Sequence, residues 1–190
     1  MEIRHITADK IGLLKELYQV AFTGSEGALV GGLARELSLV AKPTTLVAEP
    51  TTPLNTGAEV ISLGCFNENQ LIGHVAFSPL SMKGNEEISG YILSPLAVHP
   101  AFQRSGIGRA LIEHGRDVLT SRGVSILLVY GDPNYYGRFG FKGEIGHHFL
   151  PPYELNQPQG WLGLQLDESP LPEQPCQFQC VPELHHQELW

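Results

Sequence analysis

The segment from Pro95 to Val129 constrains the fold of this chain more than any other. Apolar side chains and one histidine recur between Ile107 and Leu119 at the spacing of one helix face. Gly123 supplies a stop for that helix, and Ser125–Val129 then resembles a short buried strand. Because a strand precedes the helix as well, the pattern predicts two parallel strands joined by a helical crossover.

The residues before this segment predict a helical start followed by a meander of strands. Glu2–Thr7 alternates like a strand, and Asp9 offers a cap for a helix that follows it. A second helix is expected around Leu29–Leu37. Val60–Phe66 and Leu71–Phe77 then form two strands, joined by the turn-rich tripeptide Asn67-Glu68-Asn69.

The next strand, Ile88–Val98, contains a proline that a regular ladder does not accommodate. Pro95 has no N–H group to donate, so it indicates an edge, a bulge or a place where neighbouring strands separate. The overall pattern therefore predicts an α/β fold with a mixed, mostly antiparallel central sheet and flanking helices.

The length of 190 residues fits one domain, 1–190. Lys42–Gly57 is rich in Pro and Thr, which favours an extended surface insertion. The proline-rich C-terminal extension 151–190 leaves room only for short last strands, near Trp161–Leu166 and Cys176–Val181.

The charge distribution argues against several classes of partner. The formal net charge is -8 at pH 7, and no Lys or Arg follows Lys142, whereas seven acidic residues do. A general nucleic-acid binder or an anionic-membrane binder needs the opposite sign. No apolar run approaches the roughly 20 residues of a membrane span, and the start of the chain lacks the apolar core of a signal peptide. We therefore expect a cytoplasmic protein with neither nucleic acid nor membrane as partner.

The cysteines and paired histidines do not form a recognisable metal pattern. Cys65, Cys176 and Cys180 are an odd set without a paired Cys-x-x-Cys, which is typical of a reducing compartment. His147-His148 and His185-His186 have no other ligand at metal-binding spacing. We expect no metal site.

The turn that leads into the central helix carries the strongest chemical signal. Gln103-Arg104-Ser105-Gly106-Ile107-Gly108 places two glycines and an arginine where the first N–H groups of a helix and the positive end of its dipole attract an anion. Arg109 adds a second full charge, and a diphosphate suits such a turn. The alternative is a tight α/β turn that only starts a helix. A dinucleotide fingerprint would need glycine at Leu111, and a phosphate-binding P-loop would need a Gly-Lys pair.

These residues resemble a known family. Leu96-Ala97-Val98-His99-Pro100 followed by Gln103-Arg104-Ser105-Gly106-Ile107-Gly108 is similar to motif A of the GCN5-related N-acetyltransferases (GNAT), with its Gln/Arg-x-x-Gly-x-Gly/Ala signature. Gly131-Asp132-Pro133-Asn134-Tyr135-Tyr136-Gly137-Arg138-Phe139-Gly140-Phe141 resembles the Tyr-x-x-x-Gly-Phe segment of the YhbS-like subgroup.

The resemblance implies a site for acetyl-coenzyme A (acetyl-CoA) as cosubstrate. It would lie in a V-shaped opening between the fourth and fifth strands, where one ends at Val98 and the other near Tyr130. Backbone groups of the fourth strand would bind the pantetheine arm and polarise the thioester carbonyl, the turn would hold the pyrophosphate, and Asn134 would add a polar contact. The implied cosubstrate-binding residues are Leu96, Ala97, Val98, Gln103, Arg104, Ser105, Gly106, Ile107, Gly108, Arg109, Asn134 and Tyr136.

Tyr136 is the one catalytic residue that the resemblance assigns. It sits four residues before Gly140, the position of the family's tyrosine that hydrogen-bonds the departing sulfur. A phenol with a pKa of about 10 stays protonated at neutral pH and can donate to a thiolate. The alternative is an aromatic packing residue, a role that we expect for Tyr135, Phe139 and Phe141.

The amine acceptor must lose a proton, because an alkylammonium has a pKa of about 10.4. Glu86, Glu87 or a water chain is the candidate base. His74 and His99 are weaker candidates, since a lone histidine in a strand is more often structural.

The resulting hypothesis is an N-acetyltransferase that moves an acetyl group from acetyl-CoA to a primary amine by direct attack. One alternative is a catalytically idle acyl-CoA sensor or regulatory subunit. The other is a protein acetyltransferase for lysine side chains or N-termini. The acceptor is therefore a small molecule or a protein, and a homodimer is compatible with the resemblance.

Overall fold

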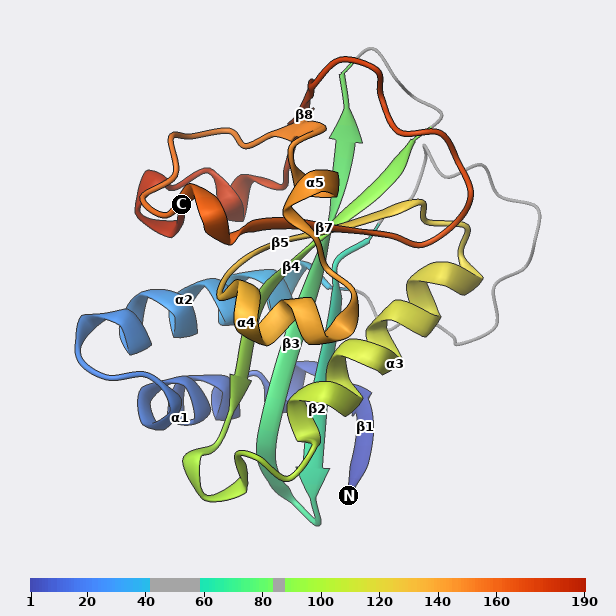
Figure 1. The fold of residues 1–190 in the computed structure, drawn as a ribbon. Coiled ribbons are helices and arrows are strands. Elements are labelled where there is room, and N and C mark those ends of the chain that lie inside the picture. The colour runs from blue at the N-terminus through green and yellow to red at the C-terminus, as the bar shows by residue number, and fades with distance from the viewer. Residues whose placement is uncertain (42–58, 84–87) are drawn as a thin grey trace. The chain divides into compact units, whose positions relative to one another are not determined.

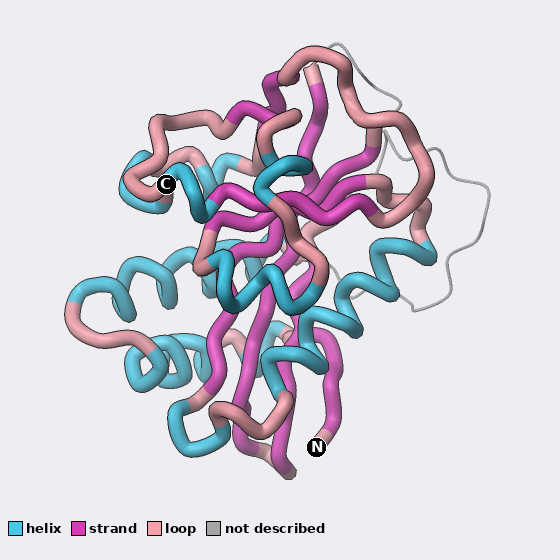
Figure 2. Tube along the Cα trace, in the orientation of Figure 1, coloured by secondary structure: helices cyan, strands magenta, loops and turns pink. Residues whose placement is uncertain are grey.

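A computed structural model of the chain describes residues 1–41, 59–83 and 88–190 (Figures 1 and 2). Its strands are β1 (Glu2–His5), β2 (Ile61–Asn67), β3 (Gln70–Met82), β4 (Ser89–Val98), β5 (Ile126–Tyr130), β6 (Phe149–Leu150), β7 (Trp161–Gln165) and β8 (Cys176–Gln179). Its helices are α1 (Gly12–Ala21), α2 (Ser25–Val40), α3 (Ile107–Ser121), α4 (Pro133–Tyr136) and α5 (Gly143–Gly146), with short 3₁₀ turns between several elements.

The described chain divides into two compact units, and β3 and β4 contribute residues to both. The first unit comprises residues 1–77 and 94–117, and the second comprises residues 78–93 and 118–190. In the first unit the strand order is β1-β2-β3-β4, and in the second unit β5 and β7 follow β4. One domain over 1–190 stays a prediction.

The strand directions confirm a mixed, mostly antiparallel sheet. β1 pairs with β2, and β2 with β3, in antiparallel register. β4 and β5 are parallel, from Gly90 opposite Ile126 to Leu93 opposite Val129, and β7 returns antiparallel to β5. The strand–helix–strand crossover predicted from the sequence is therefore present.

In the first unit, helices cover both faces of the strands. α1 and α2 lie side by side against one face of β2 and β3 (Figure 1), and Leu14, Leu17 and Tyr18 are buried there. α3 packs against the other face of β3. Its Gly115 lies so close to the Phe77 ring that a Cβ would not fit, which explains a glycine inside a strong helix.

In the second unit, an aromatic cluster organises the C-terminal residues. Trp161 of β7 stacks on Phe178 of β8 with ring centroids 6.0 Å apart, and its indole N–H donates to the Phe149 carbonyl at 2.8 Å. The Trp190 indole donates to the Leu184 carbonyl at 3.0 Å. The short strands expected in 151–190 are present as β7 and β8, whereas β6, α4 and α5 carry no periodicity long enough to predict.

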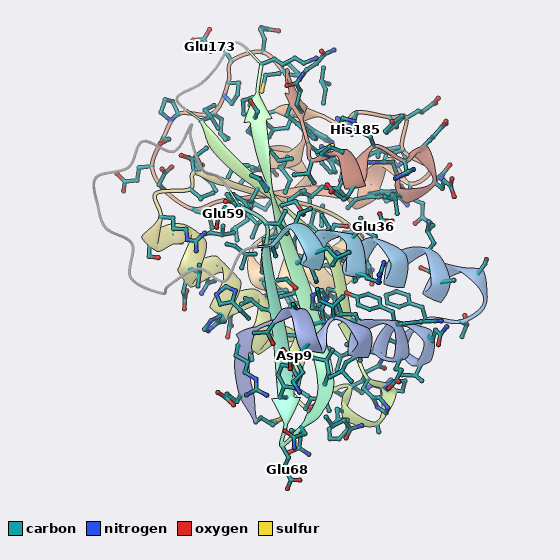
Figure 3. All side chains as sticks on the ribbon, turned by 180° about the vertical axis from the view of Figure 1, so that it is seen from behind. Asp9, Glu36, Glu59, Glu68, Glu173 and His185 are labelled. Atoms are coloured by element: carbon teal, nitrogen blue, oxygen red, sulfur yellow. The ribbon has the colours of Figure 1, made fainter. Side chains whose placement is uncertain are left out.

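Three expectations differ from the structure. Asp9 does not cap α1, which begins at Gly12, because the Asp9 carboxylate accepts the Thr7 hydroxyl at 2.6 Å inside a preceding 3₁₀ turn (Figure 3). The hairpin tip is Glu68-Asn69 alone, since Asn67 pairs with Gln70. Phe141 is buried as expected, but Phe139 is only half-buried. The expected insertion Lys42–Gly57 lies outside the described residues.

Within the described ranges, no helix has the length and apolar character that a membrane crossing needs.

Candidate functional site

The connection from β4 to α3 contains a 3₁₀ turn with its own side-chain cap. His99 caps the 3₁₀ turn Pro100–Phe102, because its Nδ1 accepts the Ala101 N–H at 3.2 Å. Its ring also meets the Phe102 ring edge to face, at 5.6 Å between centroids. His99, which the sequence left as a weak candidate base, therefore has a local structural role.

Two left-handed residues shape the turn that follows. Arg104 has φ 60° and Gly106 has φ 89°, and the Ser105 hydroxyl donates to the Phe102 carbonyl between them. The first internal bond of α3 runs from the Ala110 N–H to the Gly106 carbonyl, at 2.9 Å. In the described part of the chain, the backbone N–H groups of residues 104–108 have no acceptor. They are the donors that a bound anion would use.

The charges at this turn favour the same kind of ligand. Arg104 and Arg109 are both exposed, and α3 is long enough to present a full helix dipole. Arg109 also pairs with Glu113 one turn later, at 3.3 Å. An exposed pair of this kind holds its partners only weakly. No atom would lie within 4 Å of a Cβ at Gly106, so the turn is open on that side.

The end of β4 offers its backbone on one side. The His99 N–H bonds to the Ile72 carbonyl of β3 at 2.9 Å, so by the alternation of an antiparallel ladder Ala97 also faces β3. Leu96 and Val98 then face away from β3. The β4–β5 ladder ends at Leu93 opposite Val129, just before the Ser94–Pro95 peptide, which is cis.

Tyr136 and Asn134 lie on the short helix α4 of the second unit. Asp132 caps this helix by accepting the Asn134 N–H at 2.9 Å, and Pro133 occupies its first turn. The Tyr136 ring packs edge to face against Tyr135 and Phe141, at 5.0 and 5.7 Å between centroids. Gly131 lies beneath that ring, with no room for a Cβ.

The Tyr136 hydroxyl has no hydrogen-bond partner among the described residues, although its ring is largely covered. Burial, followed by the neighbouring Tyr135, raises the pKa of Tyr136. The phenol is therefore protonated at any physiological pH and available as a donor.

The structure places the predicted residues in two groups. Leu96–Val98 and residues 103–109 come together at one end of β4 in the first unit, whereas Asn134 and Tyr136 share one helix of the second unit. Glu86 and Glu87 lie outside the described residues. The side-chain caps of His99 and Asp132 were not predicted, although a polar residue directly before a proline is a signal that could have found them.

His74 belongs to a buried hydrogen-bond chain and not to the candidate site. Its Nδ1 lies 2.8 Å from the Tyr18 hydroxyl and its Nε2 2.9 Å from the Ser62 hydroxyl. Ser62 lies 2.7 Å from Ser38, which donates to the Ala34 carbonyl at 2.7 Å. Burial lowers the pKa of His74 to about 3, so the ring is neutral. The structural role expected of this histidine is confirmed.

In the described ranges, no three His, Cys, Asp or Glu side chains gather as a metal site. The His148 ring instead has a backbone partner, the Pro172 carbonyl, at 2.8 Å.

Comparison with protein families agrees with the fold and with the turn. Residues 61–143 match the family described as "Acetyltransferase (GNAT) domain". This segment contains the β2–β3 hairpin, β4, the Gly106 turn, α3, β5 and α4. Within 61–143, the fold and the turn are thus similar to those of a GNAT domain.

Similar proteins narrow the group. The "Uncharacterized N-acetyltransferase YhbS" of Escherichia coli (strain K12) is 39% identical over 84 residues, which are 44% of this chain and 49% of that protein. "Uncharacterized N-acetyltransferase YjhQ" of the same strain is 32% identical over 115 residues, 58% of this chain and 64% of that protein. The chain thus spans about half the length of the YhbS relatives that it matches. Over the matched segments the chain is similar to the GNAT superfamily, and among these relatives to its YhbS-like group.

Solved structures share the fold over nearly the whole chain. The GNAT family N-acetyltransferase YhbS of Escherichia coli, crystallised in complex with CoA, superposes with a TM-score of 0.75 at 21% identity, over 97% of this chain and 92% of that one. A GNAT family acetyltransferase of Brucella melitensis in complex with acetyl-CoA gives a TM-score of 0.60 at 25% identity, over 92% of both chains.

Proposed function

We propose that this chain is an N-acetyltransferase that transfers the acetyl group of acetyl-CoA to a primary amine by direct attack. The observation that carries the proposal is the turn at 104–108, whose backbone N–H groups have no acceptor in the described residues and lie at the start of α3 between two exposed arginines. The similarity of the chain to proteins crystallised with CoA and acetyl-CoA supports acetyl-CoA as the ligand.

The residues of the first unit fit the two halves of that cosubstrate. The diphosphate would accept hydrogen bonds from the amides of residues 104–109, and Arg104 and Arg109 would balance its charge. The pantetheine arm would pair with Leu96 and Val98, whose peptide groups face away from β3. A strand N–H would then polarise the thioester carbonyl and stabilise the oxyanion of the tetrahedral intermediate.

Tyr136 would complete the reaction. A neutral amine forms the new N–C bond at the acetyl carbonyl, and the C–S bond breaks as the intermediate collapses. The Tyr136 hydroxyl donates its hydrogen bond to the departing sulfur, and the released amine proton passes to water, Glu86 or Glu87. The raised pKa of Tyr136 favours this role because it keeps the phenol protonated.

Two measurements test the proposal. Acetyl-CoA should raise the melting temperature of the chain by binding the folded state, whereas NAD should not. A release assay for free CoA should then show turnover that depends on an added amine. No melting shift with saturating acetyl-CoA would overturn the proposed ligand.

The same assay separates the remaining functions. Binding without release of CoA on any acceptor would favour an acyl-CoA sensor or regulatory subunit. Release that depends on peptides with free lysines or N-termini, and not on small amines, would make the chain a protein acetyltransferase.

A further inference from the structure

The peptide group between Val98 and His99 is held at both ends. Its N–H belongs to His99 and donates to the Ile72 carbonyl of β3 at 2.9 Å. Its C=O belongs to Val98 and accepts a hydrogen bond from the Gln103 side-chain amide, Nε2, at 3.2 Å. The plane of this peptide is therefore fixed by β3 on one side and by a side chain of the turn on the other.

Gln103 is the residue through which the turn holds the strand end. Its own backbone N–H bonds to the Pro100 carbonyl at 3.3 Å, which anchors it to the 3₁₀ turn that His99 caps. A glutamine side chain has one NH₂ group and one carbonyl oxygen, and only the NH₂ can donate to Val98. One of the two N–H bonds of this exposed side chain is then directed at the protein backbone.

We infer that Gln103 is a positioning residue for the pantetheine half of the cosubstrate, and not a ligand of its diphosphate. This inference rests on the proposed function and deepens it. The Gln103 side chain donates a hydrogen bond to the Val98 carbonyl. The Val98 N–H and the N–H and C=O groups of Leu96 therefore remain for hydrogen bonds to the ligand. The same hydrogen bond connects the end of β4 to the turn that would bind the diphosphate. The distance between the pantetheine-binding strand and the diphosphate-binding turn is therefore fixed before the ligand binds.

The test separates the two halves of the ligand. The probes are CoA and its nucleotide half, 3′-phospho-ADP, titrated calorimetrically into the full chain. Gln103→Met keeps the length of the side chain and adds no charge, but it removes the donor. We expect CoA to bind about 3- to 10-fold more weakly to this variant, the effect of one net hydrogen bond, with the affinity for 3′-phospho-ADP unchanged.

Two further variants guard the interpretation. Gln70→Met changes an exposed glutamine at the start of β3 and should leave both affinities unchanged. Gln103→Arg restores a side-chain N–H donor of similar reach and should recover most of the CoA affinity. Melting curves without ligand show whether each variant is folded.

The outcomes distinguish this inference from the proposed function. Equal weakening of CoA and 3′-phospho-ADP by Gln103→Met would mean that the side chain contacts the diphosphate, and it would overturn the inference alone. Unchanged CoA affinity would overturn it as well. If the unsubstituted chain binds neither probe, the proposed function itself fails, and the inference with it.

Discussion

The regions around His74 and Tyr136 each hold a titratable side chain, which is fully buried for His74 and partly exposed for Tyr136. Burial keeps both neutral at physiological pH, because it lowers the pKa of His74 to about 3 and raises the pKa of Tyr136. Both ring nitrogens of His74 have partners, whereas the Tyr136 hydroxyl has none in the described part of the chain. A buried polar group with every partner in place stabilises the fold, whereas a partly exposed hydroxyl without a protein partner is available to a ligand.

The hydrogen bonds around His74 define its tautomer. Ser38 uses its one proton on the Ala34 carbonyl, so Ser62 donates to Ser38. His74 then donates from Nε2 to Ser62 and accepts the Tyr18 proton at Nδ1. These hydrogen bonds link α1, α2, β2 and β3 of the first unit. The His74 side chain at their centre is fully buried.

The largest effect is expected from His74→Ala. The substitution opens a cavity and removes the internal partner of two buried hydroxyls, so the free energy of unfolding should fall by about 3 kcal/mol. Urea unfolding measures it, with the exposed His185→Ala as a control that should stay within about 0.5 kcal/mol. A loss of turnover per folded molecule without a loss of stability would instead indicate a catalytic role for His74. That result would contradict the contrast between a structural His74 and a catalytic Tyr136.

Tyr136→Phe should show the opposite pattern. It keeps the ring and its packing while deleting the donor, so turnover on the best amine of a panel should fall roughly 10²-fold. Acetyl-CoA affinity and melting temperature should change little. Tyr135→Phe is the neighbouring control and should retain near-normal turnover. Full turnover of Tyr136→Phe, with chemistry rate-limiting, would show that another group stabilises the departing thiolate.

Acid should weaken the first unit through His74. An unfolded histidine has a pKa of about 6.5, above the folded value of about 3, so the unfolded chain binds the proton first as the pH falls. The stability that this group contributes is present above about pH 6.5 and is lost toward pH 3, amounting to about 2 kcal/mol between pH 7 and pH 5. Urea unfolding at both pH values should show this slope in the natural chain and a smaller one in His74→Ala. Equal slopes would mean that the ring is not held neutral.

Ser38→Ala probes the far end of the same hydrogen-bond chain. Ser62 would lose its acceptor, so unfolding should become easier by about 1 kcal/mol. Ser121→Ala removes a similar serine-to-backbone bond from the exposed end of α3, to the Val118 carbonyl, and should change stability by only a few tenths of a kcal/mol. Equal losses of stability from the two substitutions would show that burial does not increase the contribution of these serine hydrogen bonds to stability.

Local pattern was enough to predict the crossover and the turn. The helix face from Ile107 to Leu119 and the two glycines at its start, Gly106 and Gly108, are short-range signals, and α3 lies where they indicate. The structural nature of His74 was likewise predicted. Its partners were not, because Tyr18 and His74 lie 56 positions apart and Ser38 and Ser62 24 positions apart, and no periodicity links such residues.

The candidate site was predicted by residue type better than by geometry. The sequence marked Gln103 and Val98 for the same ligand, but it carried no sign that one would hydrogen-bond the other. It also did not distinguish Ala97, whose peptide groups face β3, from its two neighbours. The direction of a peptide group depends on the strand register, and the register is set by contacts with β3.

The hairpin tip between β2 and β3 offers a use in engineering. Glu68 and Asn69 are exposed, and Figure 3 shows Glu68 projecting from the end of this hairpin. Exposed loop tips accept inserted or modified residues more readily than paired strands. A cysteine at Asn69 would thus carry a fluorophore or spin label on a paired, ordered ribbon, where the probe reports motion of the strands themselves and not that of a loose chain end.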